Sequence, residues 1–408
     1  MLRTPWLHLL LLGWLSGAVA ARGQIDPETR RLIEVGYNQP MEGIAPLAAY
    51  AFYYQNQPGF LQTNLTLRLA VAPIYLDSEL GIAQALGPNT DLGIGVSGGG
   101  FADSYWEIRQ GAFRRDESFV GHGGELAVAI YHRFNPDSLI PLYGVVRNAL
   151  HYSLYERDDH TAANFALPDD QYTYHLRTGL RWGGMEPMLQ PSLAMEMSAW
   201  YEGQFRTDAG PFGFDGDRVV EPTSHMFWGR ALLAYTFTNT LQSFQVSVIA
   251  GTSIDADRLS AYRLGGMLPL AAEFPLGLPG YFTQEFSARQ FALWSGQYSV
   301  ALDYANHWNA TVFASTAWID YLPGFEQPGR WNSGVGGGIT WRSTSQTWQV
   351  MLAYARGLDA IRSSGRGANT VSLLCQIDLE ARHRYQTSSF EPRVSPDKLR
   401  GLDWLLGR

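Results

Sequence analysis

The sequence predicts an all-β fold, a transmembrane antiparallel β-barrel of the bacterial outer membrane. Three observations carry this prediction. The chain is 46% hydrophobic and 13% aromatic but only 17% charged, whereas soluble domains average about 25% charged residues. Apolar and polar residues alternate with a period of two over many stretches, as in strands with one apolar face. Long and short connections alternate between these stretches, as they do in outer-membrane barrels.

The N-terminal residues have the layout of a bacterial secretory signal peptide. A basic residue at Arg3 precedes an apolar run over residues 6–15 and small residues over 18–20. This layout predicts a signal peptide over residues 1–20. After it, no apolar run reaches the roughly 18–20 residues that a transmembrane helix requires. The lone Cys375 excludes a disulfide framework.

The remaining chain divides into three expected parts. Residues 21–40 form a short periplasmic segment, in which Asp26 can cap a short helix. Residues 41–383 form the barrel, and the charged tail over 384–408 lies outside it in the periplasm. Both ends share the periplasmic side because an even number of strands returns the chain to the side on which it began.

The alternation places about fourteen strands, with 12 to 16 as the compatible range, each long enough to cross a bilayer with about 9–11 residues. In residues 171–182, for example, Tyr172, Tyr174 and Leu176 oppose Gln171, Thr173 and His175. The expected strands cover residues 43–54, 63–76, 91–103, 123–134, 141–156, 171–183, 191–205, 225–237, 242–254, 297–306, 310–321, 331–343, 347–357 and 369–382.

The polar faces of these strands carry charges of both signs. Arg147, Arg177 and Arg181 come from adjacent strands and predict a basic wall, opposite acids such as Glu196 and Glu202. In an open pore, opposite charges that face each other across the lumen determine which ions pass. In a closed barrel they form salt bridges that brace the wall. The sequence leaves both interpretations open.

Glycines are spaced by two residues within two of the expected strands. Gly93, Gly95 and Gly98 make a formal GxGxxG, but no buried parallel strand and helix surround it, so nucleotide binding is not predicted. The spacing instead leaves a strand face bare, and another chain segment can approach it closely. Residues 334–338 repeat this pattern. The histidines lack metal-ligand spacing, and we expect neither a metal nor a cofactor.

The connection over residues 255–296 is about forty residues long, far above the usual length of a loop. Its stretch RLGGMLPLAAEFPLGLPGY, residues 263–281, is too apolar for a surface loop and too rich in proline and glycine for a helix or central strand. Apolar side chains inside a barrel are shielded from water. The sequence therefore predicts that this loop folds into the lumen as a constriction or plug.

This part of the chain resembles the bacterial surface antigen superfamily of outer-membrane protein assembly and two-partner-secretion barrels. In that family, a long loop with a motif like the YRLGG of Tyr262–Gly266 folds into the lumen and carries an Arg-Gly-aromatic tip, after which five strands close the barrel. This sequence has YRLGG, then PGY at Pro279–Tyr281, then Glu285 and Arg289, and five expected strands follow. The resemblance covers roughly the last 150 residues.

The chain departs from the family pattern at three points. Pro279 replaces the tip arginine, so the arginine that meets a wall carboxylate is expected to be Arg263 or Arg289. The segment before the first expected strand has no room for the periplasmic POTRA repeats of the family. The family barrels have sixteen strands, where about fourteen are expected here. The resemblance implies loop anchoring through Arg263, Gly265, Gly266, Gly280, Tyr281, Glu285 and Arg289, with Asp303 and Asp320 on the wall.

We expect a surface-antigen type barrel that acts as a gated or plugged channel, a transporter or a surface protein, and not as an enzyme. One alternative is a barrel component of protein assembly or lipid transfer that works with a separate periplasmic partner. Another is a transporter of hydrophobic ligands. A hydrolase would need a serine and a histidine facing lipid on neighbouring strands. The expected contacts are outer-membrane lipid and lipopolysaccharide, the expected state is a monomer, and the net charge of −8 argues against nucleic acid.

Overall fold

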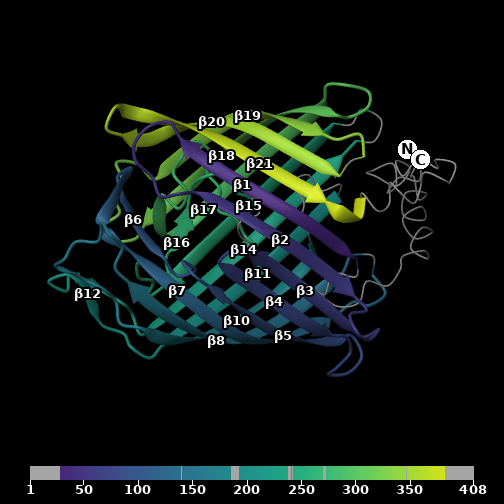
Figure 1. Cartoon of the computed structure of the whole chain (residues 1–408), viewed down its shortest axis with the longest axis horizontal. Coiled ribbons are helices and arrows are strands. Elements are labelled where there is room, and N and C mark those ends of the chain that lie inside the picture. The colour runs from purple at the N-terminus through teal and green to yellow at the C-terminus, as the bar shows by residue number, and fades with distance from the viewer. Residues whose placement is uncertain are drawn as a thin grey trace, which may run out of the picture.

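The computed structural model describes residues 28–381, apart from residues 139, 185–192, 238–239, 241, 270–272 and 346. The predicted signal peptide, the Asp26 cap and the 384–408 tail lie outside this range. The described chain forms a closed barrel of sixteen antiparallel strands (Figure 1). The barrel strands are β1 (Arg30–Pro40), β2 (Ala49–Pro58), β3 (Leu65–Ala72), β4 (Tyr75–Ile82), β5 (Thr90–Gly99), β7 (Ala112–Arg133), β8 (Leu142–Glu156), β10 (Gln171–Gly184), β11 (Leu193–Arg206), β14 (Thr223–Thr236), β15 (Ser243–Ile254), β17 (Phe286–Ala301), β18 (Trp308–Tyr321), β19 (Trp331–Arg342), β20 (Trp348–Arg362) and β21 (Gly365–Asp378).

The first and last strands close the barrel. β1 pairs with β2 on one side and with β21 on the other, in a register that runs from Leu32↔Asp378 to Pro40↔Thr370. Closure leaves no unpaired strand edge, which a sheet in hydrocarbon requires because lipid offers no hydrogen-bond partners. On the lumen side, Gln376 donates a hydrogen bond to Glu34 at 2.6 Å, and Ser372 donates one to Asn38 at 2.7 Å.

Two of the sixteen strands were not predicted from the sequence, and β17 begins eleven residues before the expected strand over 297–306. Residues 30–40, which the sequence placed before the barrel, form β1, because pairing with two neighbouring strands outweighs the local helix-start signal near Asp26. Residues 75–82 form β4, which follows β3 after a two-residue turn over 73–74. The expected strand over 63–76 therefore ran through a hairpin, although Pro73 in its turn is a breaker signal.

The outward face of the barrel is apolar and exposed. Large apolar side chains with outward exposure include Val35 in β1, Val312 in β18 and Leu352 in β20, exposed by 38%, 60% and 57%. Such a belt around the whole barrel matches the lipid-facing band of outer-membrane barrels and far exceeds the apolar patches of water-soluble surfaces. No helix in the described ranges has the length and apolarity needed to span a membrane.

The long connections fold into a cap at one end of the barrel. It contains β6 (Tyr105–Arg109), β9 (Phe165–Ala166), β12 (Pro211–Phe214) and β13 (Arg218–Val219), of which β6 and β12 are labelled at the left of Figure 1. An aromatic cluster that includes Phe119, Phe165 and Phe212 forms its core. Buried Glu107 forms ion pairs with Arg109 and Arg258, so ion pairs as well as aromatic packing hold the cap together.

Candidate functional site

The candidate site is the inward loop, residues 255–285, between β15 and β17. It begins in the cap, and its strand β16 (Tyr262–Leu264) pairs with the start of β17, Tyr262 opposite Ala288. Gly265 and Gly266 then have φ values of +135° and +72°, and a Cβ at Gly265 would overlap the carbonyl oxygen of Phe282. Glycine is needed for this turn, which directs the chain into the lumen.

The loop returns through a tip formed by Pro279, Gly280 and Tyr281. A Cβ at Gly280, where φ is +84°, would overlap the backbone nitrogen of Gly357 in β20. A Cβ at Gly334 in β19 would overlap the carbonyl oxygen of Pro279. The loop backbone therefore lies directly against the strand backbone, a close approach that only glycine permits. The bare face predicted over residues 334–338 serves this contact at Gly334.

Tyr281 fixes the tip through its ring and its hydroxyl. The side chain is fully buried in a cluster with Leu264, Leu278 and Phe286. Its hydroxyl donates a hydrogen bond to the carbonyl oxygen of Ser333 at 3.1 Å and accepts one from the backbone nitrogen of Asp359 at 3.3 Å. The tip is thereby attached to both β19 and β20.

A buried ion pair reinforces this attachment. Arg362 of β20 donates to both carboxylate oxygens of Glu285, at 2.8 and 2.9 Å, and both side chains are at most 1% exposed. The Arg362 guanidinium also lies 3.7 Å from the ring centroid of Phe282. The family resemblance implied an arginine on the loop and a carboxylate on the wall. The structure shows the reverse, because the acid lies on the loop and the arginine on the wall.

The other expected anchors have different partners. Arg263 donates to the Ser287 hydroxyl at 2.7 Å and to the carbonyl oxygen of Trp106 in the cap at 2.5 Å. Arg289 does meet Asp320, at 2.8 Å, but on the outward side of the rim, where the Arg289 side chain is 49% exposed. Neither contact joins the loop to a carboxylate on the lumen wall.

Asp303 lies far from the inward loop, in the turn between β17 and β18. Its carboxylate accepts hydrogen bonds from the backbone nitrogens of Trp308 at 2.7 Å and His307 at 3.2 Å. These donors, that of Trp308 above all, lower the pKa of Asp303 below its ordinary value. Asp303 thus stabilises a turn and does not anchor the loop.

The far part of the inward loop contacts the opposite wall. Arg181 of β10 pairs with the Glu273 carboxylate at 2.9 Å, and Arg177 lies 3.8 Å from it. Arg230 of β14 donates to the Glu273 carbonyl oxygen at 3.0 Å. Glu273 is the only charged residue between Arg263 and Glu285 in the sequence. The single charge of this apolar segment, on Glu273, therefore determines which part of the wall the loop contacts.

Aromatic contacts accompany this charge. The ring of Phe274 lies edge-on to Trp200 of β11 and Trp228 of β14, with centroid distances of 5.7 and 5.9 Å. The Arg230 guanidinium is 4.5 Å from the Phe274 centroid. Met267 and Leu268, nearer the tip, pack against a cluster on β20 and β21. The inward loop therefore spans the lumen from β19–β21 to β10, β11 and β14.

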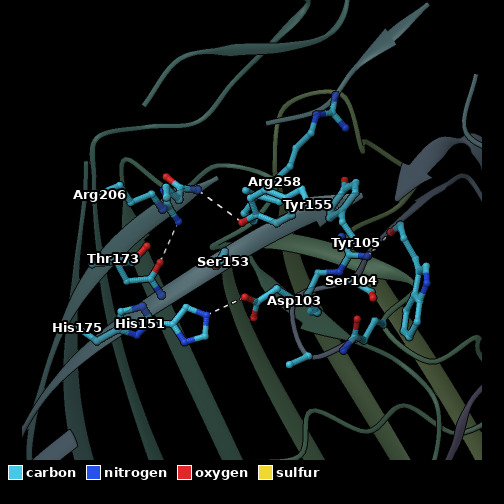
Figure 2. A pocket seen from close by; sticks show the side chains of 17 residues that line it. Asp103, Ser104, Tyr105, His151, Ser153, Tyr155, Thr173, His175, Arg206 and Arg258 are labelled. Atoms are coloured by element: carbon cyan, nitrogen blue, oxygen red, sulfur yellow. Dashed lines mark hydrogen bonds and ion pairs between the residues drawn. The ribbon is translucent and has the colours of Figure 1, made fainter. Parts of the chain in front are cut away.

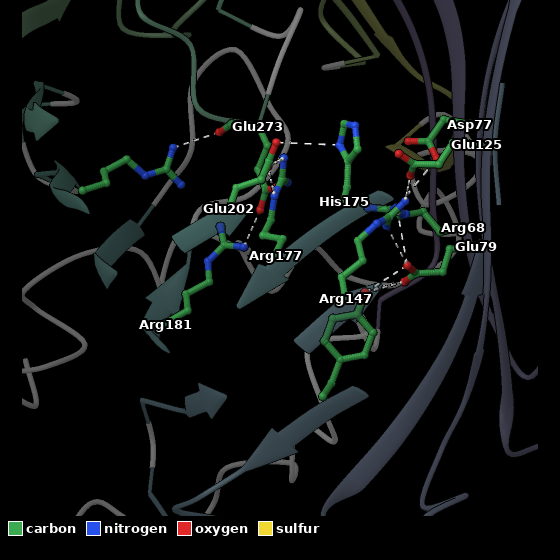
Figure 3. A network of polar contacts seen from close by, with 12 residues as sticks. Arg68, Asp77, Glu79, Glu125, Arg147, His175, Arg177, Arg181, Glu202 and Glu273 are labelled. Carbon is green, nitrogen blue, oxygen red and sulfur yellow. Dashed lines mark hydrogen bonds and ion pairs between the residues drawn. The ribbon is translucent and has the colours of Figure 1, made fainter. Parts of the chain in front are cut away.

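The lumen wall carries a network of ion pairs (Figure 3). Arg147 contacts Glu125 at 2.7 Å and Glu79 at 3.4 Å. Arg177 pairs with Glu202 at 2.7 Å. Arg181 and Arg230 share Glu196, at 2.9 and 2.5 Å. Each arginine of the predicted basic wall thus forms an ion pair with an acid on a neighbouring strand. Salt bridges of this kind stabilise the wall of a closed barrel.

Two residues of this site were not predicted from the sequence, Arg362 and Glu273. Arg362 lies beyond residue 357, where the expected strand ended, because a register shift between Gly357 and Ile361 interrupts the alternation of β20. The isolated charge at Glu273, in an otherwise apolar stretch, could have indicated a contact with an arginine of the wall. No group of three or more potential metal ligands occurs within the described ranges of the chain.

No protein-family model and no curated protein sequence matches this chain. Solved structures of similar shape include CdiB from Escherichia coli, with 11% identity and a TM-score of 0.55 over 86% of this chain and 63% of that one. CdiB from Acinetobacter baumannii has 9% identity and a TM-score of 0.53 over 86% of this chain and 60% of that one. This chain thus spans less than two thirds of either CdiB chain.

Identities this low establish a shared fold and nothing finer. The fold that the resemblance implied is confirmed, including its sixteen strands and the five that follow the inward loop, and the likeness extends over most of the chain. The chain therefore has the fold of a transmembrane antiparallel β-barrel of the bacterial outer membrane, similar to that of CdiB.

Proposed function

We propose that the protein is a gated channel of the outer membrane whose lumen is closed at rest by the inward loop. The observation that supports this most directly is the span of the loop, which contacts β19 and β20 at its tip and β10, β11 and β14 at Glu273 and Phe274. In this proposal the cap faces the cell exterior. The start of β1 and the end of β21, which pair with each other, face the periplasm.

The two attachments differ in strength, and this difference indicates which one moves. Removing one partner of a buried ion pair such as Glu285–Arg362 costs about 3–5 kcal/mol. The Glu273 side chain is 46% exposed, and solvent-screened pairs contribute about 0–1 kcal/mol. We infer that the tip is the fixed attachment and that the described residues 267–269 and 273–277 belong to the part that swings aside.

Planar-bilayer conductance of the full-length protein tests this proposal. A variant with residues 267–277 replaced by three glycines should conduct several-fold more current than the unaltered barrel, because the segment that crosses the lumen is gone. Glu273→Gln should increase the frequency of openings without changing their size. Glu326→Gln, which alters an exposed acid in the β18–β19 connection, serves as the control. Unchanged conductance in the shortened variant would reject the proposal that the inward loop closes a channel.

The polar lumen disfavours the other transport candidate, a carrier of hydrophobic ligands. Side chains on the lumen face of the described strands include buried Glu79, Glu196, Glu202 and Arg230. An apolar ligand that passed them would remove hydrogen bonds from charged groups, which is costly in a desolvated site. A channel for water-soluble solutes is consistent with this lining.

A further inference from the structure

A cavity of about 260 Å³ lies between the cap and the barrel wall (Figure 2). Its wall side is formed by β8, β10 and β11, and its other sides by residues 102–106 of the cap and by the inward loop. Figure 2 shows His151 and His175 on one side and Asp103 and Tyr105 on the other. The volume is slightly below the roughly 300–1,000 Å³ of typical ligand pockets, and it suits a molecule of monosaccharide size.

The lining is polar, and its one carboxylate, Asp103, is hydrogen-bonded to His151 at 2.7 Å and forms no ion pair with the lining arginines. Two of its arginines have carboxylate partners outside the lining, Arg206 with Asp257 at 2.7 Å and Arg258 with Glu107 at 2.5 Å. Arg263 also lines the cavity but donates only to the neutral oxygens of Ser287 and Trp106, and no described carboxylate forms an ion pair with it. A guanidinium in this position favours an anionic group.

An unused acceptor lies in the same cavity. Gln171 is only 1% exposed and lines the cavity, yet its Oε1 has no hydrogen-bond partner among the residues that the structure describes. An unsatisfied buried acceptor costs about 1–3 kcal/mol, and native structures hold few of them. A ligand hydroxyl would satisfy it. The cavity thus offers a cation for an acidic group and an acceptor for a hydroxyl.

We propose that this cavity binds a small hydroxylated organic anion of the sugar-acid class. Its carboxylate contacts Arg263 and one of its hydroxyls donates to Gln171. The charge on Arg263 provides selection against neutral sugars, and the polar lining excludes lipids. This assignment is independent of whether the inward loop gates the lumen, since it concerns the space between the loop and the cap.

Calorimetric titration of the full-length protein in detergent tests the assignment, with glucuronate as the probe and glucose as its neutral counterpart. Glucuronate should bind saturably and at least about tenfold more tightly than glucose, a difference that corresponds to about 1.4 kcal/mol. Arg263→Gln should remove that preference. Arg330→Gln, which alters an arginine at the outer rim beyond the cavity, should bind glucuronate like the unaltered protein.

Gln171→Glu provides a second variant that leaves Arg263 in place. Its added carboxylate should weaken glucuronate binding at least as much as Arg263→Gln does, because like charges repel in a small cavity. Equal affinity for glucose and glucuronate, absence of glucuronate binding, or unchanged binding by both variants would overturn the assignment. Bilayer conductance is recorded without the ligand, so a failure here is distinguishable from a failure of the channel.

Discussion

Glu285 and Arg362 show how one pair of residues holds a long loop in place. Both side chains are almost fully buried, and both carboxylate oxygens accept hydrogen bonds from the same guanidinium. Such a pair is stable only when its geometry satisfies the desolvated charges. The backbone contact at Gly280 and the hydroxyl of Tyr281 position the tip so that this geometry is met.

Neutralising the acid of this pair should destabilise the barrel. Glu285→Gln leaves the Arg362 charge buried and unpaired, and we expect the free energy of unfolding to fall by about 3–5 kcal/mol. Urea titration of the protein in lipid vesicles measures this change. Arg366→Gln is the matched control. The Arg366 side chain is 72% exposed, so its ion pair with Asp359 should contribute only about 0–1 kcal/mol. Equal effects in the two variants would contradict the role of burial.

Gly280 provides a test of the backbone contact at the tip. Gly280→Ala combines an unfavourable positive φ with a collision against the Gly357 backbone. Gly59→Ala has a similar φ of +73° but meets no described atom within 4 Å, so it isolates the cost of a left-handed backbone, about 1–2 kcal/mol. The melting temperature should fall clearly more for Gly280→Ala. Similar melting temperatures would show that the tip does not depend on close approach.

Asp303 predicts a pH dependence at the β17–β18 turn. Its pKa in the folded protein lies below its ordinary value of about 3.8 because backbone N–H groups stabilise the carboxylate. The stabilisation is therefore complete above the unfolded pKa and is lost as the pH falls through the lower, folded value. Asp303→Asn should be less stable than the unaltered protein at pH 7, and their melting temperatures should converge near pH 2. A constant difference across this range would refute the assignment.

At the scale of elements, local alternation determines most of the barrel but not its irregular parts. Strands such as β10 and β11 were predictable because one face is consistently apolar, as with Met195 and Met197 opposite Glu196 and Ser198. β4 was missed because only a two-residue turn separates it from β3, although Pro73 in that turn was a usable signal. The pairing of Glu285 with Arg362 was also beyond the sequence, because it joins residues 77 positions apart across a register shift.

The composition of the inward loop was the informative part of the site prediction. Its glycines and its apolar side chains indicated a segment shielded from water, and Leu264, Leu278 and Tyr281 are indeed fully buried. Which charges would hold it could not be derived, because the facing strand is determined by the register of the whole barrel. Arg263 illustrates this limit, since it contacts the cap and the Ser287 hydroxyl of β17 instead of a wall carboxylate.

At the scale of the whole molecule, the distribution of polarity is that of a membrane barrel. Exposed apolar side chains surround the outside, while carboxylates and guanidiniums are paired inside. The lumen therefore contains the charge that a hydrocarbon-facing surface excludes. Contact with lipopolysaccharide, the monomeric state and a periplasmic partner protein stay predictions from the sequence.

Substituting a charge into the apolar belt tests its orientation towards lipid. Leu352→Arg places a guanidinium on the outward face of β20, and an arginine near the bilayer midplane costs about 2–4 kcal/mol. Leu61→Arg alters a side chain that is 84% exposed in the turn between β2 and β3 and should have little effect. Unfolding from lipid vesicles measures both. A negligible cost at Leu352 would place this face outside the hydrocarbon.

The most direct test of the central claim is the single-channel conductance of a barrel whose loop tip is released. A double variant with Gly280→Ala and Glu285→Gln removes the backbone contact and the buried pair without shortening the chain. The matched control combines Gly59→Ala with Arg366→Gln. If the inward loop closes the lumen, the first variant should conduct and the control should remain closed like the unaltered protein. Identical conductance in all three, with the barrel folded, would contradict the account.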